Sequence, residues 1–128
     1  MTIVVICLAI VVFMPMLAKV PLAIMMNKQG GYNNRQPREQ QKSLEGLGAR
    51  SKAAHENCFE ATTFFAPTIL LVLALNAVNH TTAYLCIAFV VSRLAYLVCY
   101  WCDWHLLRSL VWGIGMVTIA THYFLLLS

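Results

Sequence analysis

The chain has 128 residues, of which 60% are hydrophobic and only 11% are charged. A soluble domain of this size could not bury so much apolar surface, so the composition excludes a soluble globular protein and indicates an integral membrane protein. The net charge of +4 does not indicate nucleic-acid binding, because the basic residues gather beside apolar segments and no aromatic residues interleave with them on a soluble surface. We therefore expect no nucleic-acid partner.

The predicted elements follow from hydropathy and length. A membrane-spanning helix needs about 20 predominantly apolar residues, and the sequence supplies such stretches at about 3–27, 52–76, 81–101 and 106–127. In the polar segment 28–51, residues 39–47 are expected to form a short helix at the membrane surface. The other connections are short, which makes consecutive helices antiparallel. The predicted fold is one all-α domain over residues 1–128, an integral membrane antiparallel four-helix bundle.

The basic residues predict the orientation of these helices. They flank the first and third connections, whereas the second connection and both ends of the chain have none. By the positive-inside rule, the segment 28–51 and the third connection lie in the cytoplasm, and both termini lie on the other side. The first apolar segment is expected to be a retained helix rather than a cleaved signal peptide. Pro15 and Pro21 should bend it.

Three ionisable side chains, Lys19, Glu60 and Arg93, fall inside the predicted helices at a similar depth. At a rise of about 1.5 Å per residue, Glu60 lies roughly 12 Å from the cytoplasmic end of its helix. Charges at this depth are too costly to face lipid alone. We expect them to face the bundle interior or a subunit interface, with Glu60 and Arg93 within salt-bridge or single-water distance. The alternative is a purely structural charge pair.

Polar residues also recur at helical spacing on two predicted helices: Arg50, Asn57 and Glu60 on the second, and Arg93, Tyr96 and Tyr100 on the third. Each set shares one helical face. Together the two faces can line a hydrated pocket with cationic and hydroxyl donors and one carboxylate. Such a pocket suits a small anionic molecule that carries an ammonium group. The alternative is that the charges neutralise each other and the tyrosines anchor the membrane interface.

The five cysteines do not indicate a disulfide framework. Cys7, Cys58, Cys86 and Cys99 fall within predicted spans, where they are expected to pack as small apolar core residues. Cys99 and Cys102 have the spacing of a redox pair, but without a thioredoxin-like strand context we expect coincidence. No metal site is expected, because Cys99, Cys102 and His105 have no convincing fourth ligand except His55 or Asp103.

The segment GYNNRQPREQQKSLEGLGARSKAAHENCFEA, followed by RLAYLVCYWCDWHLLRSLVW, resembles a bacterial member of the MAPEG family, the membrane-associated proteins in eicosanoid and glutathione metabolism, of the microsomal glutathione transferase type. The motifs Asn57-x-x-Glu60 and Arg93-x-x-Tyr96-x-x-x-Tyr100 are specific in combination. The resemblance covers essentially the whole chain. It implies a homotrimer in a bacterial inner (plasma) membrane, with glutathione bound as co-substrate at each subunit interface near the cytoplasmic side.

Carried over by position, the resemblance implies the following glutathione-binding residues: Arg50, Asn57, Glu60, Arg93, Tyr96, Tyr100 and Arg108. Arg108, at the start of the last helix, resembles the arginine that stabilises the glutathione thiolate. An adjacent cation lowers the pKa of a thiol, and the thiolate is the reactive form. Tyr96 would donate its hydroxyl to the thiolate or the substrate, so Arg108 and Tyr96 are the candidate catalytic residues.

Two functions stay open on the sequence. The first is a membrane-bound glutathione-dependent transferase or peroxidase, whose partners are membrane lipids and a lipophilic electrophile or lipid hydroperoxide that enters from the bilayer. The second is a non-enzymatic lipid-binding or scaffold protein of the same fold. Arg93, Tyr96 and Arg108 favour the enzyme. Ala53 and Glu56, at positions where glutathione-using relatives commonly carry arginine, favour the alternative.

Overall fold

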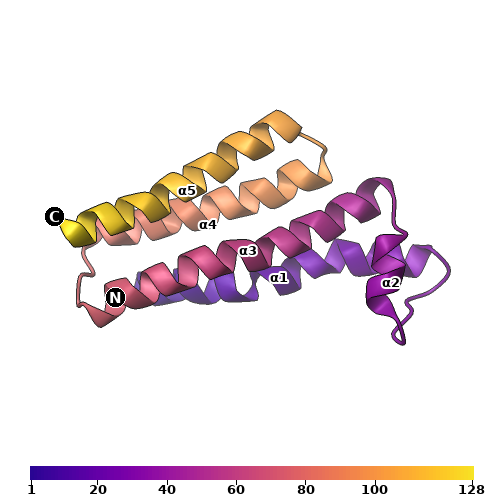
Figure 1. Ribbon diagram of the computed structural model, residues 1–128, viewed down its shortest axis with the longest axis horizontal. Helices are drawn as coiled ribbons and strands as arrows, with labels where there is room; N and C mark the ends of the chain where they lie inside the picture. Colours follow the sequence, from indigo (N-terminus) through magenta and orange to yellow (C-terminus); the bar gives the residue numbers. More distant parts are fainter.

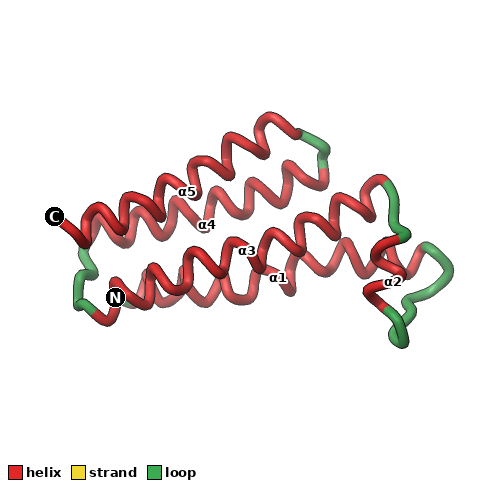
Figure 2. Tube along the Cα trace, viewed as in Figure 1, coloured by secondary structure: helices red, strands yellow, loops and turns green.

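The computed structural model describes residues 1–128 and is all-helical, with no strand (Figures 1 and 2). In chain order the helices are α1 (Thr2–Lys28), α2 (Pro37–Lys42), α3 (Gly46–Ala74), α4 (His80–Trp101) and α5 (His105–Leu127). All except α2 are long and apolar enough to cross a membrane. The predicted all-α fold with four candidate spans is therefore confirmed.

Two helix boundaries in the first connection differ from the prediction. The helix α3 begins at Gly46, not at 52, because backbone hydrogen bonding continues past the apolar run into the polar segment. The short helix α2 covers Pro37–Lys42 rather than 39–47. Proline is favoured at the first helical position, since its missing N–H is not needed there and its φ already suits a helix. Hydropathy alone does not predict where α2 and α3 begin, because both starts lie in the polar segment.

The long helices form two antiparallel pairs, α1 with α3 and α4 with α5 (Figure 1). Both termini lie at one end of the bundle, and α2 lies at the other end. The helix α5 packs mainly on α4 and touches α3 much less. A cavity lined by residues of α3, α4 and α5 lies where α3 and α5 touch little.

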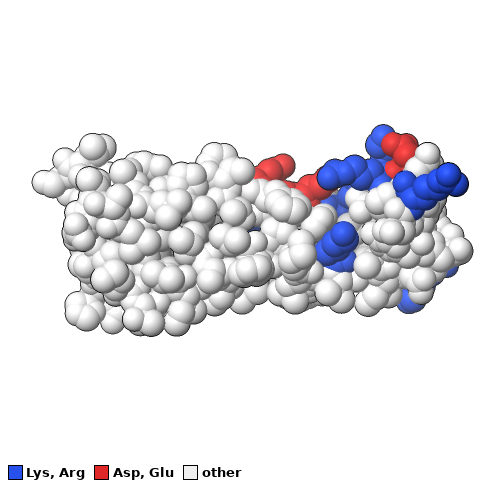
Figure 3. Space-filling model, turned by 90° about the horizontal axis from the view of Figure 1, so that it is seen from below, with Lys and Arg blue, Asp and Glu red and all other residues white.

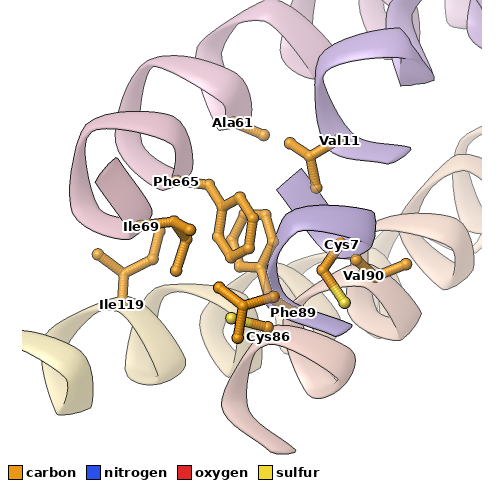
Figure 4. Packing of buried hydrophobic residues seen from close by; sticks show 10 residues of the cluster. Cys7, Val11, Ala61, Phe65, Ile69, Cys86, Phe89, Val90 and Ile119 are labelled. Carbon is orange, nitrogen blue, oxygen red and sulfur yellow. The ribbon is translucent and has the colours of Figure 1, made fainter. Parts of the chain in front are cut away.

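The main core joins α1, α3, α4 and α5 and is shown in Figure 4. The rings of Phe65 and Phe89 stack with their centroids 4.2 Å apart and their planes 7° from parallel. Cys7 and Cys86 are buried in the same cluster. Cys58 and Cys99 are also buried. The prediction that these four thiols are packing residues is confirmed.

The helix α1 continues through Pro15 and Pro21. Because Pro15 has no N–H, the carbonyl of Val11 loses its usual helical donor four residues on. The Thr62 hydroxyl of α3 lies 3.3 Å from this carbonyl oxygen and donates to it. A polar backbone group exposed in a spanning helix is thus satisfied by a neighbouring helix. This contact also fixes α1 against the half of α3 that carries the polar residues.

Candidate functional site

The candidate site lies where α3 faces α4, in the half of the bundle nearer α2. Arg93 of α4 is 2% exposed, and its Nη2 donates a hydrogen bond to Asn57 Oδ1 of α3. Asn57 Nδ2 in turn donates to Glu60 Oε2 at 2.8 Å. One amide side chain can do both because its oxygen accepts and its nitrogen donates. The three residues therefore form a relay, Arg93 to Asn57 to Glu60.

The relay rules out one of the two contacts expected between Glu60 and Arg93. They make no ion pair, since the salt bridges of the chain join other residues, and they are linked instead through the side chain of Asn57. Asn57 lies between Arg93 and Glu60. It shares one face of α3 with Glu60, and its side-chain oxygen accepts the hydrogen bond from the Arg93 guanidinium. Arg93 faces protein, as predicted, whereas Glu60 is exposed on the surface of the single chain. Sequence spacing placed all three on facing helices but could not show which pair makes contact.

A file of four side chains, with a cation at each end and two aromatic rings between them, leads from the relay to the start of α5. The Arg93 guanidinium lies 4.1 Å from the centroid of the Tyr96 ring. The Tyr96 and Tyr100 rings pack edge to face at 5.1 Å. The Arg108 guanidinium lies 4.4 Å from the Tyr100 centroid. Cation–π and edge-to-face contacts of this kind are each worth about 0.5–1 kcal/mol or more. They hold two cations at opposite ends of one tyrosine pair.

The turn between α4 and α5 explains how Arg108 reaches Tyr100. The chain reverses over Cys102–Trp104, with Asp103 in the left-handed region at φ +62°. The Trp104 N–H donates to the Cys99 carbonyl at 2.9 Å, which closes the reversal. Arg108 then falls in the first turn of α5, half-buried against the end of α4. The short connection was predicted, but the left-handed conformation of Asp103 was not.

Arg50 lies apart from Asn57 and Glu60, nearer the α2 end of α3. Its guanidinium is 3.7 Å from the Asp103 carboxylate. It therefore shares the α4-facing side of α3 with Asn57, as the periodicity predicted, but at a different level. This contact joins the start of α3 to the turn between α4 and α5. Lys19 lies on another side of the bundle, in a cavity beside α2.

A cavity of about 60 Å³ opens at the relay between α3, α4 and α5. Asn57, Glu60 and Arg93 form its polar side. Its apolar side was missed by sequence reasoning and consists of Ala61, Phe64, Phe89, Trp112, Gly115, Met116 and Ile119. This volume is well below the roughly 300 Å³ at which pockets for small-molecule ligands begin. A larger ligand must therefore extend over the exposed surface around Glu60.

Gly115 is the one position in this wall with a detectable sequence signal. A Cβ atom added there would lie 3.0 Å from the Ser92 hydroxyl oxygen. Glycine thus allows α5 to approach α4 closely beside the cavity. The Gly113-x-Gly115 pair in an otherwise bulky apolar span could have marked this approach.

The site has a definite chemical capacity. Arg93 and Arg108 supply fixed positive charge, and Tyr96 and Tyr100 supply hydroxyl groups beside them. Asn57 and Glu60 supply an amide and a carboxylate on the facing helix. The Nε of Arg93 is buried without a hydrogen-bond partner. The arrangement thus places two cations, two phenols, an amide and a carboxylate beside one another between α3, α4 and the start of α5.

These features define a multi-pass helical membrane protein with a polar site between two of its spans. The chain belongs to the MAPEG family, whose sequence profile matches residues 3–128. No curated protein and no solved structure matches the chain. Family membership agrees with the resemblance carried by the Asn57–Glu60 and Arg93–Tyr100 motifs.

Proposed function

We propose that the protein is a glutathione-dependent transferase or peroxidase that acts on lipophilic electrophiles or lipid hydroperoxides in a bacterial inner membrane. Membership of the MAPEG family supports a membrane function related to glutathione. The single observation that carries the proposal is the continuous file of Arg93, Tyr96, Tyr100 and Arg108. One cation of this file is buried beside the relay, and the other lies in the first turn of α5.

Glutathione fits the residues that are present. The Nε of Arg93 is a buried donor without a partner, and a glutathione carboxylate would accept from it if the side chains around the relay move apart. The exposed carboxylate of Glu60 is an acceptor for the glutathione ammonium group. Asn57 and Tyr100 would contact polar parts of the peptide. Arg50 would hold a distal carboxylate if its contact with Asp103 opens.

The chemistry would follow from the position of Arg108 and Tyr96. The half-buried Arg108 guanidinium stabilises a thiolate more than a thiol, so it lowers the thiol pKa and raises the fraction of the nucleophile. The backbone N–H groups at the start of α5 favour negative charge at the same place. The Tyr96 hydroxyl would donate to the thiolate or to the leaving group. A lipophilic substrate would approach from the bilayer.

We also propose a homotrimer. Glu60 is an exposed carboxylate well inside a spanning helix, and a carboxylate in that position is costly unless a polar group outside its own chain faces it. A neighbouring subunit, together with a ligand held between the two, would supply such a group. The small volume of the cavity within one chain points the same way.

A non-enzymatic lipid-binding or scaffold function is the second candidate. It is favoured by the residues near Asn57, where Ala53 carries no charge and Glu56 pairs with Lys52 at 3.2 Å. Arg50, the cation that would replace the missing arginine, is held by Asp103 at 3.7 Å. Under this function the relay and the aromatic file would serve helix packing and assembly alone.

Turnover distinguishes the two candidates. The purified protein in lipid vesicles should form a glutathione conjugate with an activated aryl halide, or reduce a lipid hydroperoxide, faster than glutathione alone does. A variant with Arg108→Ala is the matched control for adventitious activity in the vesicles. If neither the wild type nor Arg108→Ala reacts faster than glutathione alone, the non-enzymatic function is favoured.

The distribution of charge supports a definite orientation. In Figure 3 the Lys, Arg, Asp and Glu side chains gather toward the end of the bundle that carries α2, and the face near the termini shows none. By the positive-inside rule we propose that the α2 end is cytoplasmic and that both termini are not.

Cysteine labelling in intact cells tests this orientation. After the native cysteines are replaced, Lys42→Cys and His80→Cys place one exposed thiol at each end of the bundle. A membrane-impermeant reagent should label the thiol at position 80 and not the thiol at position 42 until the cells are opened. The reverse pattern would contradict the orientation.

A further inference from the structure

The two basic residues at the start of α3 are each paired with a carboxylate of the same chain. Arg50 Nη1 lies 3.7 Å from Oδ2 of Asp103, in the turn between α4 and α5. Lys52 Nζ lies 3.2 Å from Oε1 of Glu56, one turn further along α3. The Nε of Arg50 is buried, so this guanidinium meets other groups through its terminal nitrogens. Neither cation can therefore bind a carboxylate of a ligand at full strength without leaving its own partner.

The turn that carries Asp103 is fixed by its backbone. It joins the ends of α4 and α5 nearer to α2 (Figure 1). The Cys102 N–H donates to the Val98 carbonyl at 2.9 Å, and the Trp104 N–H donates to the Cys99 carbonyl at 2.9 Å. Asp103 itself has φ +62°, a left-handed conformation that aspartate and asparagine adopt more readily than most residues. The carboxylate therefore comes from a fixed point beside α3 rather than from a free loop.

The spacing along α3 matches Arg50 to the far end of a glutathione molecule bound at the relay. Arg50 and Asn57 are seven residues apart on one face, which corresponds to about 10 Å at the helical rise. An extended chain of three residues has about the same length. If the γ-glutamyl end, with its carboxylate and ammonium group, lies at Arg93 and Glu60, the glycine carboxylate reaches the level of Arg50. The first end meets groups that have no ion-pair partner, whereas the second meets a cation that Asp103 already holds.

We propose that Asp103 sets the thiol specificity of the site by occupying Arg50. To bind the glycine carboxylate, Arg50 must exchange one partly exposed carboxylate for another, so the gain and the loss nearly cancel. The site then selects the γ-glutamyl end alone, and its co-substrates are γ-glutamyl thiols as a class, with or without a free carboxylate at the other end. The inference rests on the proposed glutathione-dependent function. Asp103 is a positioning residue in it, because it acts through Arg50.

Turnover with two forms of the thiol tests the proposal. The purified protein in lipid vesicles would be assayed with an activated aryl halide and with either glutathione or its glycyl ethyl ester, which lacks the free distal carboxylate. The quantity measured is the ratio of kcat/KM for glutathione to kcat/KM for the ester. Any change in turnover that affects both thiols alike cancels in this ratio. N-acetylcysteine, which has no γ-glutamyl end, is the comparison for the other half of the molecule.

Three variants isolate the contact between Arg50 and Asp103. Asp103→Asn removes the negative charge and keeps a residue type that tolerates the left-handed turn. It should raise the ratio about fivefold, the upper range for one exposed ion pair, because Arg50 is released. Adding Arg50→Gln to Asp103→Asn should return the ratio to the wild-type value. The matched control is Glu56→Gln, which removes the same charge and releases Lys52 on the opposite side of α3 from Arg50, so the ratio should not change.

For the wild type we expect a ratio within about twofold of unity, and turnover without saturation for N-acetylcysteine. A wild-type preference for glutathione of about fivefold or more, or an unchanged ratio in Asp103→Asn, would overturn this inference and leave the proposed function standing. Equal use of N-acetylcysteine, or an equal shift in Glu56→Gln, would also overturn it. If neither γ-glutamyl thiol gives saturable turnover, the proposed function and this inference fall together.

Discussion

Replacing Asn57 by leucine should destabilise the protein more than replacing Asn57 and Arg93 together. Arg93 is 2% exposed, and its guanidinium donates a hydrogen bond to the side chain of Asn57. The variant Asn57→Leu leaves a buried cation without its acceptor, which costs about 3–5 kcal/mol in comparable buried pairs. The double variant Asn57→Leu with Arg93→Met removes the cation as well, so most of that cost should disappear.

Unfolding by a denaturing detergent, followed by circular dichroism, measures this difference. The single variant Arg93→Met belongs in the comparison, because together the variants form a double-mutant cycle that isolates the interaction between the two residues. Glu60→Gln is the control at the exposed end of the relay and should change stability little. If Asn57→Leu and the double variant unfold at the same detergent fraction, the relay does not hold the buried charge.

Replacing Arg108 by alanine should lower turnover by roughly a hundredfold, the size of effect seen when one transition-state donor is removed. The pKa of bound glutathione should rise, since the cation beside the thiolate is gone. Peptide affinity should change little, because Arg93, Asn57 and Glu60 remain. The control is Arg108→Lys, which keeps a positive charge but not the guanidinium that contacts Tyr100. It should retain part of the rate if the charge, rather than this contact, drives turnover.

Glu60→Gln should have the opposite signature. Its exposed carboxylate would hold the glutathione ammonium group in the ground state and the transition state alike, so its loss should raise KM and leave kcat nearly unchanged. Steady-state kinetics together with a pH titration of thiolate absorbance separate the two variants. Equal losses of kcat and affinity in both would show that the substitutions damage the structure rather than separate functions.

The sequence was sufficient for the fold and for the two polar faces, because hydropathy and the helical period determine both. It was not sufficient for the contacts. Depth placed Lys19 level with Arg93, but depth carries no information on the direction of a side chain around its helix. In the structure Arg93 donates a hydrogen bond to Asn57, whereas Lys19 lines the cavity beside α2. The start of α3 was missed for a similar reason, since backbone hydrogen bonds extend beyond the apolar run.

Other parts of the site depend on tertiary geometry that no local pattern encodes. The contact of Arg50 with Asp103 depends on the turn between α4 and α5, in which Asp103 adopts the left-handed backbone conformation. The wall formed by Trp112 and Met116 requires the close approach of α5 to α4 at Gly115. Both features depend on how α5 is placed. A short polar connection predicts the reversal of the chain but not the rotation of the helix that follows.

The proposed function depends most directly on whether Arg108 stabilises a glutathione thiolate. Titration of the purified wild-type protein with glutathione near neutral pH, followed by the ultraviolet absorbance of the thiolate, measures this at equilibrium. We expect a saturable rise in thiolate absorbance that is much smaller in Arg108→Ala, although that variant still binds the peptide by calorimetry. The absence of glutathione binding by wild type at millimolar concentration would contradict the account and favour the lipid-binding or scaffold function.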